Sequence, residues 1–91
     1  MRHRADDNQK KIVSGLRNIG ATVVVLSQVG AGCPDIMVGF RGETFLFEIK
    51  GEKGKLSESQ ENWRLLWRGG HAAVARSLGE VIEEITKRLP K

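Results

Sequence analysis

The spacing of apolar residues along this 91-residue chain predicts three helices. In each of them, apolar side chains recur every three or four positions and so share one helical face. Serine begins the second and the third of these segments, and a Gln or Glu three residues later completes a capping-box pattern. The predicted helices run from Asp6 or Asp7 to Gly20, from Ser57 to Gly69–Gly70, and from Ser77 to Pro90.

Four short apolar runs between these helices predict β-strands. The second and third runs are separated by Arg41-Gly42, which has the length of a hairpin turn. The connection from the third strand through the second helix to the fourth predicts a right-handed crossover between parallel strands. The predicted strands are Ala21–Leu26, Pro34–Phe40, Glu43–Lys50 and His71–Ala75.

The element order is therefore α-β-β-β-α-β-α, which predicts an α/β fold with a mixed four-stranded sheet flanked by helices. Residues 1–91 are expected to form one small domain, with residues 1–5 as a flexible basic arm.

The composition indicates which partners and which cellular compartment suit this domain. A formal net charge of +4 and a pI near 9.6 permit contact with a polyanion, although a mildly basic soluble surface gives the same values. Cys33 is the single cysteine, so an internal disulfide is excluded and a reducing cytoplasm is expected. No apolar run approaches the roughly 20 residues of a membrane span. No signal-peptide pattern follows the charged first residues.

Charged residues interrupt the apolar hairpin at its open end. Counting from a two-residue turn places Asp35 opposite Glu48, and strand alternation places Lys50 on the same face as Glu48. Two carboxylates this close repel each other unless a cation lies between them. The pattern predicts a divalent metal site with an adjacent lysine. The alternative is an incidental surface salt-bridge cluster.

These residues also carry a family resemblance. The segments Gly32-Cys33-Pro34-Asp35, Glu48-Ile49-Lys50-Gly51 and Leu56-Ser57 with Gln60 resemble the VRR-NUC (virus-type replication-repair nuclease) family of the PD-(D/E)xK nuclease superfamily. The resemblance spans roughly residues 6–76 and implies a restriction-endonuclease-like core. Minimal chains of this kind are typically phage or prophage proteins, which implies work in the cytoplasm of a bacterial host.

The resemblance assigns roles to the charged cluster. Asp35 and Glu48 are the expected ligands of Mg²⁺ or Mn²⁺, ions that prefer hard oxygen donors. The carbonyl of Ile49 is implied as a third ligand by the resemblance alone. Lys50 is expected to orient the attacking water or help deprotonate it, and to offset the negative charge that develops.

Two glutamines are further candidate catalytic residues. Related resolvases carry a glutamate in the first helix near the position of Gln9, and a glutamine is a weaker metal ligand. An exposed helix residue is the alternative for Gln9. Gln60 can cap Ser57 or point at the acidic pair, and both can hold at once.

The remaining candidates are contacts to DNA. Lys53 and Lys55 flank the predicted site and are candidates for phosphate contacts, with a solvated loop as the alternative. Ser27 and Gln28 are weaker candidates for the DNA backbone. Trp63 and Trp67, four residues apart, are expected in the core or in a dimer interface rather than stacked on bases.

Taken together, the pattern and the resemblance predict a metal-dependent DNA endonuclease. Stand-alone relatives resemble Holliday junction resolvases, which implies branched or four-way junction DNA as the substrate and a homodimer as the active form. A nickase, flap nuclease or restriction-like enzyme would use the same residues. A non-catalytic DNA-binding module is the alternative from another class.

Overall fold

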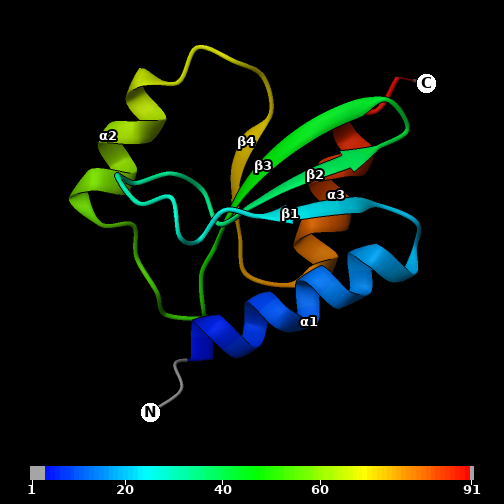
Figure 1. Ribbon diagram of the computed structural model, residues 1–91, viewed down its shortest axis with the longest axis horizontal. Coiled ribbons are helices and arrows are strands. Elements are labelled where there is room, and N and C mark those ends of the chain that lie inside the picture. The colour runs from blue at the N-terminus through cyan, green and yellow to red at the C-terminus, as the bar shows by residue number, and fades with distance from the viewer. Residues whose placement is uncertain (1–3, 91) are drawn as a thin grey trace.

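The computed structural model describes the backbone of residues 4–90 and the side chains from Asp7 to Pro90 (Figure 1). The order of its elements is the one predicted from the sequence. The elements are α1 (Arg4–Asn18), β1 (Thr22–Val25), β2 (Ile36–Phe40), β3 (Glu43–Ile49), α2 (Glu58–Leu66), β4 (Ala72–Ala75) and α3 (Leu78–Arg88).

The four strands form one mixed sheet in the order β1-β2-β3-β4. The first three strands are antiparallel to their neighbours, and β4 runs parallel to β3 after the crossover through α2. In the hairpin, Phe40 pairs with Glu43 and Ile36 pairs with Phe47, so the predicted register is confirmed. Positive φ angles at Arg41 (50°) and Gly42 (83°) give the turn the twist that a two-residue hairpin needs.

The hydrophobic core lies on one face of the sheet. Phe45, Phe47 and Ile49 alternate along β3 and are buried there, where α1 and α3 lie in contact with each other and with the strands. From α1 the core receives Ile12 and Leu16. Glu48 and Lys50 lie on the opposite face of β3, as the alternation predicts.

The second helix is placed differently from the other two (Figure 1). Its Ser57 cap and capping box form as predicted, but none of its residues is buried. Trp63 and Trp67 stack on each other with ring centroids 4.9 Å apart, outside the hydrophobic core. The option that these tryptophans belong to the core is therefore wrong, because α2 is not packed on the sheet.

The first helix begins earlier than the sequence suggested. It starts at Arg4, so Asp6 and Asp7 belong to its first turn and do not precede it. Negative charge is favourable at that end of a helix, which explains why the helix extends through both residues. Arg4 and Ala5, assigned to a flexible arm, are helical, and the rest of that arm lies outside the described residues. Within residues 4–90, no helix is long and apolar enough to cross a membrane.

Candidate active site

The candidate site lies where the β2–β3 hairpin opens, and hydrogen bonds to the backbone and the carboxylate of Asp35 hold it there. Its N–H donates to the Phe47 carbonyl at 3.0 Å, and its carbonyl accepts from the Leu26 N–H at 2.7 Å. Its side-chain Oδ2 accepts from the N–H of Ile49 at 2.7 Å. Backbone bonds to both neighbouring strands thus aim the Asp35 carboxylate at the end of β3.

Pro34, which precedes Asp35, leaves the Ile49 carbonyl without a backbone hydrogen bond from that position. In an antiparallel pair, the N–H and C=O of a strand residue point to the same neighbour. The Ile49 N–H points to Asp35, so its carbonyl faces the same side. Pro34 has no N–H and cannot donate to that carbonyl. The end of the hairpin therefore places a carboxylate and a carbonyl oxygen on the same side of β3.

Glu48 is the buried member of the acidic pair, with 4% of its surface exposed. Burial raises its pKa from 4.5 to about 8, assisted by the hydrogen bond and the negative charge of Asp35. Lys50 acts in the opposite direction, because its Nζ lies 3.7 Å from Glu48 Oε2. The single adjacent lysine therefore does not outweigh burial and the charge of Asp35, which together raise the pKa of Glu48.

Gln60 makes both of the contacts considered for it. Its Oε1 accepts from the Ser57 N–H at 2.8 Å, and its own N–H donates to Ser57 Oγ at 3.2 Å. Its Nε2 meanwhile donates to Glu48 Oε2 at 3.0 Å. The capping box thus fixes the Gln60 side chain while its amide reaches the site, so this side chain links α2 to β3.

Gln9 and Ser27 are brought together, although they belong to α1 and to the turn after β1. Gln9 Nε2 donates to Ser27 Oγ at 3.1 Å, and the reverse bond from the hydroxyl to Gln9 Oε1 measures 3.3 Å. Within the described residues, the hydrogen bonds of Gln9 go to Ser27 and not to the acidic pair. Gln28, Lys53 and Lys55 lie exposed on the loops that follow β1 and β3.

The Gly-rich loop before Asp35 is packed against the start of α2. Gly32 has a φ of +80°, and a Cβ there would overlap the backbone carbonyl of Ser59. Cys33 follows it, and burial, then the charges of Glu48 and Asp35, raise the pKa of its thiol. The thiol therefore stays protonated, which fits a packed residue rather than a nucleophile.

Two residues that the sequence interpretation assigned no role, Asn8 and Arg76, lie beside the end of β3. The Asn8 amide donates to the carbonyls of Lys50 and Arg76, and the Arg76 guanidinium donates to the carbonyl of Gly51. Nothing in the sequence pattern marked Asn8, because its partners lie 42 and 68 residues away.

The donors gathered here suit a hard divalent cation. Within the described residues, no three His, Cys, Asp or Glu side chains cluster as metal ligands. What the hairpin offers instead is two carboxylates and one carbonyl, all oxygen donors of the kind that Mg²⁺ and Mn²⁺ accept together with water. The raised pKa of Glu48 indicates that added positive charge would stabilise this cluster.

No protein-family model matches the sequence, and no curated protein matches it. A solved structure described as a "VRR_NUC domain" is similar over 97% of this chain and 100% of its own, with 27% identity and a TM-score of 0.71. This likeness supports the VRR-NUC family for this chain. The predicted restriction-endonuclease-like architecture is thereby confirmed.

The similarity to a VRR_NUC domain supports a nuclease of the PD-(D/E)xK type, and a nuclease domain implies DNA binding. Nucleases of this type generally use divalent metals. The similarity extends over nearly the whole chain, so it supports a nuclease for the domain as a whole.

Proposed function

We propose that this VRR-NUC chain is a metal-dependent endodeoxyribonuclease that cuts branched DNA, such as four-way junctions, as a homodimer. The observation that carries the proposal is the cluster of Asp35, Glu48 and Lys50 at the open end of the hairpin, with Lys50 Nζ 3.7 Å from Glu48. A buried glutamate beside a second carboxylate is costly unless it is used, because burial and the negative charge of Asp35 both oppose the ionisation of Glu48.

Asp35, Glu48 and the carbonyl of Ile49 would hold Mg²⁺ or Mn²⁺. When bound, the ion supplies Lewis-acid stabilisation of charge on the phosphate and lowers the pKa of an attacking water. Asp35 is already oriented by its bond from the Ile49 N–H at 2.7 Å. The hydrogen bonds of the protein thus orient two of the three ligands in advance.

Lys50 and Gln60 would complete the reaction site from two sides. The Lys50 ammonium would orient the attacking water and help it lose a proton by stabilising the negative charge that forms on its oxygen. It would also offset negative charge that develops on the phosphate. Gln60 holds Glu48 in one rotamer through its bond at 3.0 Å. Both roles require the geometry described above, and neither requires a second metal ion.

Contacts to the DNA backbone would come from the loops beside this cluster. Gln9 and Ser27 form a polar pair, with Gln28 next to it, and their donors suit phosphate or sugar oxygens. Lys53 and Lys55 add exposed positive charge on the loop after Lys50. In this assignment Gln9 assists by binding substrate rather than by direct metal ligation.

The exposed side of α2 supports a homodimer. Leu65 and Leu66 are 76% and 72% exposed, and Trp67 is 40% exposed. Apolar side chains gathered on one exposed helix indicate an interaction surface. Resolving a junction takes two paired nicks, whereas one chain carries one cluster, so a second copy covering α2 is the occupant we propose. Host and location, a phage or prophage protein in the bacterial cytoplasm, are part of the same proposal.

The test is cleavage of labelled DNA by the purified protein. Four-way junction, flap, nicked and plain duplex substrates are incubated with Mg²⁺ or Mn²⁺. Lys50→Ala and EDTA serve as controls, and Lys87→Ala is the matched loss of one exposed lysine on α3, outside the cluster and the proposed DNA contacts. Paired symmetric nicks in the junction, lost in Lys50→Ala and EDTA but kept in Lys87→Ala, are expected.

Other outcomes would change the proposal in defined ways. Cleavage mainly of flap, nicked or plain duplex would retain the metal site and replace the substrate. Binding without cleavage of any substrate would indicate a non-catalytic DNA-binding module. Cutting by a species that stays monomeric in light scattering would overturn the homodimer.

A further inference from the structure

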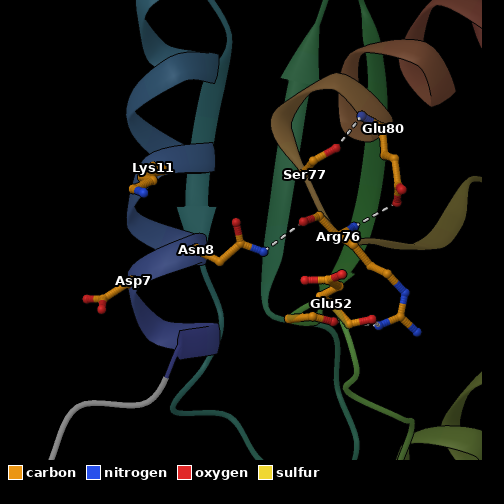
Figure 2. Close-up of a pocket in the computed structure, with 8 residues that line it drawn as sticks. Asp7, Asn8, Lys11, Glu52, Arg76, Ser77 and Glu80 are labelled. Atoms are coloured by element: carbon orange, nitrogen blue, oxygen red, sulfur yellow. Dashed lines mark hydrogen bonds between the residues drawn. The ribbon is translucent and has the colours of Figure 1, made fainter.

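One amide side chain bridges the ends of the two parallel strands. Asn8 Nδ2 donates to the carbonyl of Lys50 at 3.0 Å and to the carbonyl of Arg76 at 2.9 Å. Figure 2 shows Asn8 reaching from α1 toward Arg76. Lys50 directly follows the last residue of β3, and Arg76 directly follows the last residue of β4.

The chemistry of the acceptors defines which atom of Asn8 must face them. Both partners are carbonyl oxygens, which only accept hydrogen bonds, and the amide nitrogen carries two hydrogens. The opposite orientation of the amide would direct an oxygen at two other oxygens. Asn8 therefore acts here as a double donor.

These bonds bear on the proposed catalytic lysine. The N–H of Lys50 donates to the Ala75 carbonyl at 3.0 Å, so Asn8 adds a bond on the other side of the same residue. With both backbone groups held, the Cα–Cβ direction of Lys50 is fixed, and its Nζ lies 3.7 Å from Glu48.

Hydrogen bonds from Arg76 hold the turn that follows Lys50. The Arg76 guanidinium donates to the Gly51 carbonyl at 2.6 Å, and the Arg76 N–H donates to Glu80 Oε1 at 2.8 Å. The latter bond ties the turn to α3, as Figure 2 shows. Asn8 therefore connects α1 to a turn that is also tied to α3.

We infer that Asn8 is a positioning residue, which holds the backbone of Lys50 so that its ammonium stays aimed at the acidic pair. The inference deepens the proposed function and rests on it for the role of Lys50. A displacement of about 1 Å in a catalytic group can slow a reaction by about a hundredfold. Loss of this clamp should therefore slow cleavage without weakening DNA binding.

The experiment compares three substitutions with a matched control. Asn8→Ala removes both donors, Asn8→Asp keeps the shape but directs oxygens at both carbonyls, and Asn8→Gln keeps the donors on a longer side chain. Asn18→Asp makes the same chemical change at an exposed position near the other end of α1. Single-turnover cleavage at saturating DNA and the Kd for DNA are measured separately, and backbone hydrogen exchange is followed by NMR in the metal-free protein.

We expect the Asn8→Ala and Asn8→Asp variants to cut at least about tenfold more slowly than wild type. Asn8→Asp should be the slower of the two, and Asn8→Gln should cut at an intermediate rate. The Kd for DNA of each variant should stay within twofold of the wild-type value. Exchange at the Lys50 amide should accelerate while core amides stay protected. Cleavage at the wild-type rate by Asn8→Asp would overturn the inference, as would slow cleavage with unchanged exchange at Lys50. If the wild type cuts no DNA, the proposed function fails, and exchange at Lys50 still tests the clamp.

Discussion

The buried carboxyl group of Glu48 predicts an unusual pH dependence of stability in the metal-free protein. Its pKa is about 8 in the folded chain, against an ordinary value of 4.5, because it is buried beside Asp35. Between these two values the folded chain holds a proton that the unfolded chain has released. The stabilisation from this group is therefore complete below about pH 4.5 and is lost as the pH rises through about 8.

The size of this loss follows from one proton. A difference of one bound proton changes the free energy of unfolding by about 1.4 kcal/mol per pH unit. Integrated from about pH 5.5 to about pH 7.5, the loss approaches about 2.5 kcal/mol. For a domain of this length that corresponds to a fall in Tm of roughly 10–20 °C.

Glu48→Gln removes the titration while keeping the contacts. The new amide oxygen can accept from Gln60 Nε2, and the amide nitrogen can donate to Asp35. Urea unfolding in EDTA, measured for both proteins across this pH range, should show a falling profile for wild type and a flatter one for the variant. The variant should be the more stable protein near pH 8.

The other ionisable groups are present in both proteins, so their contributions cancel in the difference between the two profiles. Parallel profiles, with a difference that stays constant within about 0.5 kcal/mol, would refute the burial and pairing of Glu48. Adding Mg²⁺ should restore wild-type stability near neutral pH and leave the variant less affected, because a ligand stabilises the state that binds it.

Three further outcomes test the site and the loops around it. Lys50→Ala should lower the single-turnover cleavage rate by about a hundredfold or more with DNA affinity unchanged; wild-type rates would remove Lys50 from the mechanism. Lys53→Ala and Lys55→Ala should each reduce the slope of log affinity against log salt by about one, and unchanged slopes would place that loop outside the DNA interface. Gly32→Ala should destabilise the protein by about 2 kcal/mol more than Gly30→Ala, measured in urea. Both glycines have a φ of +80°, but only a Cβ at Gly32 meets the Ser59 carbonyl; equal losses would contradict that contact.

Local sequence determined the parts of the site that lie close together along the chain. The Arg41-Gly42 turn sets the hairpin register, and the register brings Asp35 next to Glu48, because every further pair follows from the first by counting. Strand alternation likewise places the Glu48 side chain on the opposite face of β3 from that of Phe47. The capping box of Ser57 and Gln60 is also local and was confirmed, since its two residues lie within one helical turn.

Tertiary structure decided the features that depend on residues far apart in the chain. The spacing of Trp63 and Trp67 allowed either the core or a dimer interface, and the folded chain leaves α2 exposed. Periodicity shows which residues share a face but not whether anything covers it. The pKa of Glu48 depends on its burial, and burial requires the folded chain. Asn8 illustrates the same limit. Its role exists only because folding brings α1 to the ends of β3 and β4, which places one amide between two carbonyls that are distant in the sequence.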